Sequence, residues 1–234
     1  MKAATRVVGS LGKVDVVSYH ASNRGMYLFG PVIALVCKLA RKPVVLRIFG
    51  GSFGEYYSAR GRLGRYIVRK TVFSADVILI QTKRTMAQLE QHSSGRLVWF
   101  ATYVQMMGGK PARAQVPERA SDRTCKKFVF LGHLWKTKGI DVILDAAALL
   151  PGDAGIDIYG PLDEYSESEI ETRGQGRVRY CGFLTHGEVE ERLADYDCLL
   201  LPTFHESEGY PGVIAEAFTC GLPVIATDWL AIPE

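Results

Sequence analysis

Closely spaced cysteines are missing from this sequence. Its five cysteines are scattered and form no C-x-x-C pair, and most lie in apolar stretches, as in Tyr180-Cys181-Gly182. Disulfide scaffolds and structural zinc sites need such spacings. We therefore expect reduced, mostly buried thiols, as in a cytoplasmic protein, and no bound metal.

Long apolar runs are missing as well. The most apolar stretch, residues 26–40, contains Pro31 and Lys38 and is shorter than the ~20 residues that a membrane-spanning helix needs. Residues 1–13 contain no apolar core of the kind found in signal peptides. These absences favour a cytoplasmic protein that contacts a membrane at most peripherally, at its cytoplasmic face.

Acidic residues are scarce in the first half of the chain. Residues 1–115 contain 18 basic and 4 acidic residues, a net charge of +14, whereas residues 116–234 contain 10 basic and 21 acidic residues, a net charge of −11. This asymmetry indicates two units that meet different partners. No nucleic-acid-binding module is recognisable, so we expect no nucleic-acid partner.

What is present is an ordinary globular composition in 234 residues, 47% hydrophobic and 23% charged, which excludes a disordered or collagen-like chain. Apolar strands alternate with helices, a pattern typical of parallel sheets covered on both faces. The expected strands lie at residues 14–19, 43–48, 75–80, 96–99, 127–131, 155–159, 178–181, 198–201 and 223–226. The expected helices lie at 27–40, 56–73, 82–91, 138–150, 164–172, 186–195 and 212–219.

The alternation is interrupted by a glycine-rich and polar segment at residues 105–124, where the charge balance also changes sign. We interpret this segment as a linker. The predicted fold is therefore α/β, with a partial Rossmann-like domain at 1–104 and a second doubly wound domain at 125–234.

The most informative stretch runs from His205 to Glu216 and joins a buried strand to a helix. Pro211 suits a first helical turn, and Gly209, Tyr210, Gly212 and Val213 offer backbone amides or close backbone approach. Such a helix N-terminus is suited to binding a diphosphate.

Two carboxylates bracket this loop, Glu208 before the helix and Glu216 within it. Glu216 could accept hydrogen bonds from a ribose diol, or it could be an exposed helix residue; Glu208 could face a sugar or interact with the helix N-terminus. Lys138, in the loop that begins at Gly132 and His133, could neutralise a diphosphate or be solvent-exposed.

Taken together, these stretches resemble the retaining nucleotide-sugar glycosyltransferases of family 4, group 1 enzymes with the GT-B fold. The residues that carry the likeness are Phe130–Leu134 with Lys138-Gly139, Tyr180–Leu184, the Glu-x7-Glu element Glu208 to Glu216, and Ala217–Asp228. In that family two Rossmann-like domains face a cleft. The resemblance further implies that this chain is the middle of a longer enzyme, with both ends incomplete.

The resemblance also implies roles for individual residues. Glu208 and Lys138 would be catalytic. Glu216 would hold the donor ribose, Phe183 and Leu184 would lie near the base, and the remaining donor-binding residues would be Gly132, His133, Gly209, Tyr210, Pro211, Gly212 and Val213. His20, Gly50 and Gly51 would lie on the acceptor side. His133 stands where the family usually has arginine, and Phe49 where it often has histidine.

The implied function is transfer of a hexose, with retention and without a metal or other cofactor, from a nucleotide diphosphate sugar to a glycan or lipid-linked acceptor. The setting would be polysaccharide or cell-envelope glycan biosynthesis. A non-catalytic nucleotide-sugar-binding subunit is one alternative. A nucleotide-sugar 2-epimerase or a sugar phosphorylase of the same fold is another, although the Glu-x7-Glu element argues against it.

Arginines cluster on one face of a helix in the basic half. Arg62, Arg65 and Arg69 follow an i, i+3, i+7 spacing, which places them together on that helix. They could form an ordinary solvated face, or they could contact anionic lipid or a lipid diphosphate acceptor.

Overall fold

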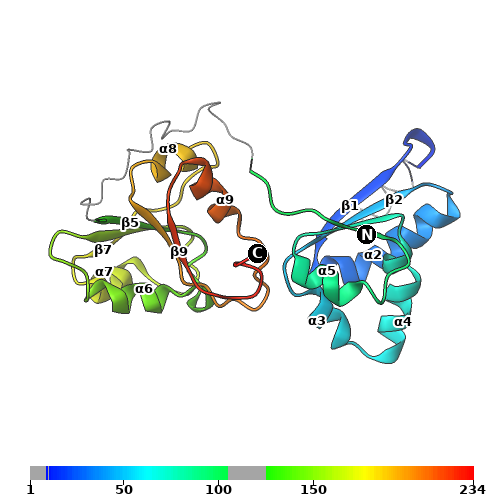
Figure 1. Ribbon diagram of the computed structural model, residues 1–234, viewed down its shortest axis with the longest axis horizontal. Coiled ribbons are helices and arrows are strands. Elements are labelled where there is room, and N and C mark those ends of the chain that lie inside the picture. Colours follow the sequence, from blue (N-terminus) through cyan, green and yellow to red (C-terminus); the bar gives the residue numbers. More distant parts are fainter. Residues whose placement is uncertain (1–8, 10, 105–124) are drawn as a thin grey trace. The chain divides into compact units, whose positions relative to one another are not determined.

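The computed structural model describes residues 9, 11–104 and 125–234 (Figure 1). The chain divides into two compact units. Unit 1 comprises Met1–Ala101 with Ser207–Tyr210 and Leu230–Glu234, and unit 2 comprises Thr102–Glu206 with Pro211–Trp229. The predicted linker, residues 105–124, lies outside the described residues, and the predicted domain limits stay predictions.

Unit 1 contains a parallel sheet with the strand order β1-β2-β3-β4. Its strands are β1 (Val17–Ser22), β2 (Val44–Phe49), β3 (Val77–Ile80) and β4 (Arg96–Trp99). Its helices are η1 (Leu11–Lys13), α2 (Asn23–Leu39), α3 (Phe53–Ser58), α4 (Arg62–Lys70), η2 (Val72–Ser74) and α5 (Lys83–Leu89).

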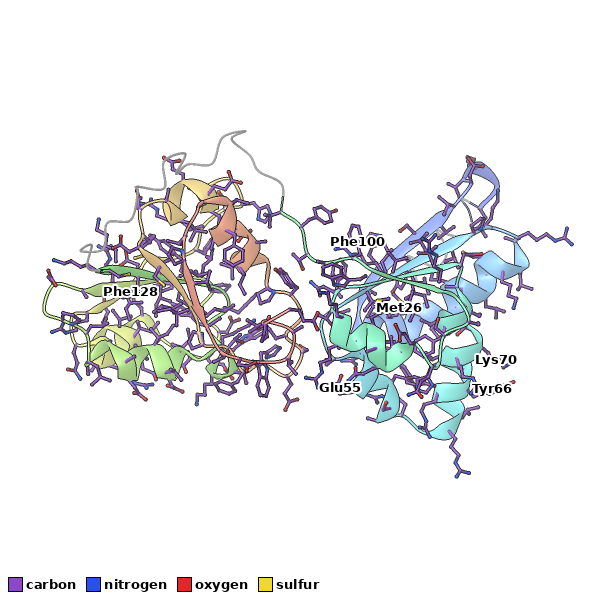
Figure 2. All side chains as sticks on the ribbon, in the orientation of Figure 1. Met26, Glu55, Tyr66, Lys70, Phe100 and Phe128 are labelled. Atoms are coloured by element: carbon purple, nitrogen blue, oxygen red, sulfur yellow. The ribbon has the colours of Figure 1, made fainter. Side chains whose placement is uncertain are left out.

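The helices of unit 1 cover one face of this sheet. Crossovers between parallel strands are almost always right-handed, so a sheet whose strands follow each other in one direction receives all its helices on the same side. One core cluster accordingly joins Leu46 and Ile48 of β2 to Met26, Phe53 and Val68 of three different helices. Figure 2 shows Met26 inside this layer, and Figure 1 shows α3, α4 and α5 on one side of β1 and β2.

The opposite face of the unit 1 sheet differs from our expectation of two covered faces. It presents Ser18, His20, Val45, Arg47 and Leu79, which alternate with the core positions of β1, β2 and β3. None of these residues belongs to a core cluster of the described chain. A helix on this side would need a strand on the far side of β1, and the described residues supply none.

Unit 2 contains a five-stranded parallel sheet with the order β7-β6-β5-β8-β9. Its strands are β5 (Lys127–Leu131), β6 (Gly155–Tyr159), β7 (Val178–Tyr180), β8 (Cys198–Leu201) and β9 (Val224–Ala226). Its helices are η3 (Lys136–Lys138), α6 (Ile140–Ala147), α7 (Glu167–Gly174), α8 (Val189–Leu193) and α9 (Gly212–Thr219). Numbered by appearance, the order is 3-2-1-4-5, that of a Rossmann-like sheet.

This order covers both faces of the unit 2 sheet. The first two crossovers build outward from β5 in one direction, and the next two build in the other, so the helices fall on opposite sides. Ile143 of α6 and Ile170 of α7 belong to one core cluster, whereas Leu193 of α8 and Ala217 of α9 belong to a second. Figure 1 shows α6 and α7 below the strands and α8 and α9 above them.

Two predicted elements differ from those observed. The first strand runs over Val17–Ser22 rather than 14–19, because its register is set by pairing with β2, where Val17 faces Val44. The single helix predicted at 56–73 is instead three short helices. Gly61, with φ −61° and ψ 162°, interrupts it as the N-cap of α4.

Cys37, Cys198 and Cys220 are buried free thiols, as predicted, whereas Cys125 is exposed. The helices in the described part of the chain are all too short or too polar to cross a membrane.

Candidate functional site at the carboxyl ends of β5 and β8

The strand order of unit 2 reverses once. At that place the chain leaves two neighbouring strands toward opposite faces of the sheet. That point lies between β5 and β8, which pair through Phe128 with Cys198 and Val129 with Leu199. Ligands of open α/β sheets bind in the crevice at the carboxyl ends of two such strands. The loops that leave β5 and β8 are the two on which the sequence analysis placed most of its candidate residues.

These two loops are in direct contact within unit 2. The amide of Phe204 donates to the carbonyl of Thr137 at 2.8 Å, and the Thr137 hydroxyl lies 3.0 Å from His205 Nδ1. Gly139 has φ +81°, and a Cβ atom there would lie 2.1 Å from the carbonyl oxygen of Pro202. Only glycine fits this position, so the Lys138-Gly139 pair fixes how closely the loops approach.

Gly132 has a different reason to be glycine. A Cβ atom at Gly132 would lie 3.4 Å from its nearest protein neighbour, the Phe130 ring, which is an ordinary contact. Protein packing therefore leaves room for a side chain here. Close approach of a ligand is the other common reason for glycine at such a position.

A row of aromatic rings spans the two loops. The His133 ring stacks on Trp135 with 4.6 Å between centroids, and Trp135 lies 5.2 Å from His205. His133 Nδ1 also lies 2.9 Å from Asp163 Oδ2, and the Trp229 indole N–H donates to the His205 carbonyl at 2.9 Å. His133 is thus positioned by one ring contact and one polar contact at the carboxyl end of β5.

The sequence analysis missed Trp135, Asp163, His205 and Trp229. Trp135 and His205 lie inside the two stretches it selected, but they are 70 positions apart in the sequence. Only the pairing of β5 with β8 shows that they meet.

Lys138 is the last residue of η3 and is half-buried, whereas its neighbour Lys136 is exposed. Its backbone amide donates to the Trp135 carbonyl at 2.9 Å. The turn therefore anchors Lys138 beside the aromatic row, at the carboxyl end of β5.

The N-terminus of α9 has no side-chain cap. Pro211 occupies the N-cap position, one residue before the first helical turn that we predicted for it, and Gly212 begins the helix. The Ile214 amide donates to the Pro211 carbonyl at 3.2 Å. Within the described chain no acceptor meets the amides of Gly212 and Val213, so both can donate to an anion.

Glu216 lies one turn further along α9 and is half-buried. Burial raises the pKa of its carboxyl group above the ordinary value, and Glu190 raises it further, while His186 opposes the shift. A carboxylate in such surroundings gains most from donors that a ligand would supply.

The other donor-side candidates have different surroundings. Phe183 is 74% exposed after β7, whereas Leu184 packs against the core of unit 2. Glu208 is buried, and with Gly209 and Tyr210 it groups with unit 1. The Glu-x7-Glu element is thus divided between the two units, with Glu216 in unit 2.

The acceptor-side candidates lie in unit 1. His20 is exposed on β1, where its Nε2 lies 2.8 Å from the Ser18 hydroxyl. Gly50 and Gly51 follow β2, and Gly50 has φ +95°. Beside His20 lies a residue that the sequence analysis overlooked, the buried Arg47, whose guanidinium lies 4.6 Å from the Phe49 and Phe100 rings.

The three arginines of the predicted basic face lie on α4, where Val68 is the one buried residue. The same helix also exposes apolar side chains, with Leu63 73% exposed and Tyr66 59% exposed. Figure 2 shows Tyr66 and Lys70 on its outer side. The helix therefore presents arginines and apolar side chains to solvent together.

No cluster of three or more His, Cys, Asp or Glu side chains suited to a metal ion occurs within residues 9, 11–104 and 125–234.

Residues 125–234 match the family described as glycosyl transferases group 1. This segment is unit 2 almost in its entirety and contains both loops of the candidate site.

Curated relatives carry glycosyltransferase names. The 2-deoxystreptamine N-acetyl-D-glucosaminyltransferase of Streptomyces fradiae is 30% identical over 240 residues, covering 90% of this chain and 54% of the relative. The amylovoran biosynthesis glycosyltransferase AmsK of Erwinia amylovora is 27% identical over 141 residues, covering 56% of this chain and 35% of the relative. The chain thus spans about half the length, or less, of these relatives.

Solved structures share the fold over almost the whole chain. Alr3699/HepE of Anabaena, solved in complex with UDP, superposes with a TM-score of 0.70 at 17% identity, covering 98% of this chain and 64% of that one. Sucrose-phosphate synthase of Thermosynechococcus elongatus gives a TM-score of 0.69 at 18% identity, covering 97% of this chain and 60% of that one. Residues 125–234 thus match the group 1 glycosyl transferases, and the chain shares the fold of these solved structures.

Proposed function

We propose that this chain forms the central part of a retaining family 4 glycosyltransferase that transfers a hexose from a nucleotide diphosphate sugar. The acceptor is a glycan or a lipid-linked sugar, and the pathway is polysaccharide or cell-envelope glycan biosynthesis. The observation that carries the proposal is the contact between the loops that follow β5 and β8 in unit 2, the unit that also holds Lys138, the uncapped N-terminus of α9 and the partly buried Glu216. A structural neighbour solved with UDP supports a nucleotide donor.

The proposed donor site uses each group for one task. Glu216 accepts hydrogen bonds from the two ribose hydroxyls, which relieves the cost of its burial. Phe183 stacks on the base, with Leu184 packed behind it. Gly132, His133, Pro211, Gly212 and Val213, all of unit 2, surround the diphosphate and the sugar.

In the proposed reaction the acceptor oxygen forms a bond to the anomeric carbon of the hexose. The bond from that carbon to the diphosphate oxygen breaks, its electron pair stays on the diphosphate, and the departing diphosphate takes the proton of the acceptor hydroxyl. Lys138 and the α9 amides neutralise this developing charge, a contribution that in other enzymes amounts to about 3–4 kcal/mol for one well-placed donor. These groups supply the positive charge without a metal ion or another cofactor.

Unit 1 would bind the acceptor through His20, Gly50 and Gly51. We further propose that the protein is cytoplasmic and contacts an anionic membrane at its cytoplasmic face through Arg62, Arg65 and Arg69. The exposed Leu63 and Tyr66 beside these arginines support this contact, because basic and apolar side chains together are typical of interfacial helices.

Lys138→Ala tests the catalytic part of the proposal in the intact enzyme. We expect turnover to fall about 100- to 1000-fold, since one charge-stabilising donor is lost, while donor affinity changes little. Lys136→Ala is the matched control, because Lys136 lies two residues earlier in the same turn and is exposed. This variant should retain full turnover. Equal rates for both variants would contradict the proposal.

A non-catalytic donor-binding subunit remains the alternative, favoured by histidine at position 133 and phenylalanine at position 49. Release of nucleotide from the donor sugar separates the two functions. An enzyme releases nucleotide continuously, whereas a binder saturates with donor and releases none.

A further inference from the structure

The amino edge of the unit 1 sheet contains a cavity that the proposed function does not use. Its volume is about 310 Å³, within the range of small-ligand sites. It lies between the end of α2, the start of β2 and the turn after α4, and it is lined by Ala34, Lys38, Arg41, Lys42, Pro43, Val44, Thr71, Ser74, Ala75 and Asp76. The six residues of β2 separate it from Gly50, a distance of about 20 Å.

Three cations line this cavity. Within the described residues, the side chains of Lys38, Arg41 and Lys42 form no ion pair or side-chain hydrogen bond. The one acidic side chain of the lining is Asp76, whose Oδ2 accepts the backbone N–H of Val44 at 2.8 Å. With three cations and one carboxylate, the lining therefore has an excess of positive charge within the described part of the chain.

The backbone at Arg41 adds an independent observation. Arg41 has φ +53°, and it occupies the position after α2 where the amide of Arg41 donates to Lys38 and the amide of Lys42 to Cys37. This pair of bonds is the Schellman motif, whose left-handed residue is usually glycine. An arginine here costs conformational energy relative to glycine.

A cavity at the amino edge of the unit 2 sheet provides the contrast. Four cations line it, and three of them are paired: Lys126 with Asp153, Arg179 with Asp157 at 2.7 Å, and Arg192 with Asp195 at 3.6 Å. Most cations at this edge of unit 2 are therefore neutralised, whereas the three at the corresponding edge of unit 1 form no ion pair within the described residues.

Exposed leucines adjoin the unpaired cations. Leu35 is 50% exposed and Leu39 is 77% exposed, and both lie in the last turns of α2 beside Lys38. A free phosphate ion gains nothing from such neighbours, whereas a lipid brings a phosphate and an apolar chain together.

We propose that the cavity formed by Lys38, Arg41 and Lys42 binds the phosphate of an anionic phospholipid headgroup, with Leu35 and Leu39 in contact with the lipid chains. This site is separate from the donor site, and it differs from the α4 arginines because it is a built pocket rather than a helix face. It deepens the membrane contact proposed above and does not depend on glycosyl transfer.

Vesicle sedimentation of the full chain at low salt tests this site. The probe is a phosphatidylcholine vesicle with or without phosphatidylglycerol. We expect Arg41→Gly to weaken binding to the anionic vesicles about fivefold, which corresponds to about 1 kcal/mol for one basic residue near the surface. Because glycine suits the left-handed position, the melting temperature of this variant should stay the same or rise.

Two matched controls separate charge from backbone strain. Gln175 ends α7 with φ +50°, so Gln175→Gly relieves the same kind of strain in unit 2 and should leave vesicle binding unchanged. Arg96→Ala removes one exposed positive charge from β4 of unit 1 and should also bind normally.

The outcomes distinguish this site from the α4 contact. Lost binding in Arg41→Gly with an unchanged or higher melting temperature supports the site. A lower melting temperature with normal binding would show that Arg41 only stabilises the end of α2, and would overturn the proposal. The proposal would also be overturned if Arg41→Gly had no effect on vesicle binding while charge reversal of Arg62, Arg65 and Arg69 abolished it. That result would still support the membrane contact proposed for α4. Binding of inorganic phosphate without binding of vesicles would show that the ligand is not a lipid and would overturn the proposal.

Discussion

The two units are built from the same strand–helix alternation but differ in how their sheets are covered. In unit 1 the strands follow one another in a single direction, and one core lies on one face. In unit 2 the direction reverses at β5, and a core lies on each face. The reversal also brings the loops after β5 and β8 together, so the same topological step completes the sheet and creates the candidate site.

The difference in how the two sheets are covered is tested most directly in unit 1. Ile78 of β3 is fully buried on the covered face, whereas its neighbour Leu79 is half-buried on the other face. Ile78→Ala should reduce the free energy of unfolding by about 3 kcal/mol, and Leu79→Ala by about 1 kcal/mol. Urea denaturation of both variants measures the difference. Equal losses would mean that both faces of the sheet are covered.

Two glycines of the candidate site in unit 2 test whether protein packing or a bound ligand excludes a side chain. Gly139→Ala should lower the free energy of unfolding by about 2 kcal/mol or more, because the added Cβ meets the Pro202 carbonyl and φ is positive.

Gly132→Ala, whose Cβ makes only ordinary contacts, should unfold like the wild type and bind the donor more weakly. Thermal unfolding and donor titration together check this pair. Normal donor binding by Gly132→Ala would contradict a ligand approach at the end of β5.

The ionisation of Glu216 should make the stability of the protein depend on pH. Its folded-state pKa is raised, so its contribution to stability is present below the unfolded pKa, about 4.3, and is lost as pH rises through the folded pKa. Glu216→Gln should therefore be more stable than the wild type at neutral pH, with the difference disappearing in acid. Donor affinity at neutral pH should fall about tenfold, since a charged acceptor is lost. Thermal scans at several pH values and donor titration measure both.

The smallest effect is expected at Asp163. Its pair with His133 is partly exposed, and such pairs contribute less than about 1 kcal/mol. Asp163→Asn should leave stability within about 0.5 kcal/mol of the wild type and weaken donor binding two- to threefold, roughly the loss of one orienting hydrogen bond. Unchanged donor binding would show that Asp163 does not orient His133 for the ligand.

Much of the fold could be predicted from the sequence because strong local patterns survive folding. The strands at Lys127–Leu131 and Cys198–Leu201 and the helix at Gly212–Thr219 lie where apolar runs and helix-start residues predict them. The register of β1 and the break at Gly61 were not predictable in this way. The first depends on pairing with β2, and the second on the backbone of a single glycine.

The same distinction between local and long-range features applies to the candidate site. The sequence by itself was enough to propose the candidate residues, from Lys138 to Glu216, because motif spacing around a strand end or helix start is local. Only the tertiary structure decided that Trp135 meets His205, that packing excludes a side chain at Gly139 but leaves room for one at Gly132, and that one sheet is covered on one face and the other on two. Those features follow from which strands are neighbours, and neighbour relations join residues that are far apart along the chain.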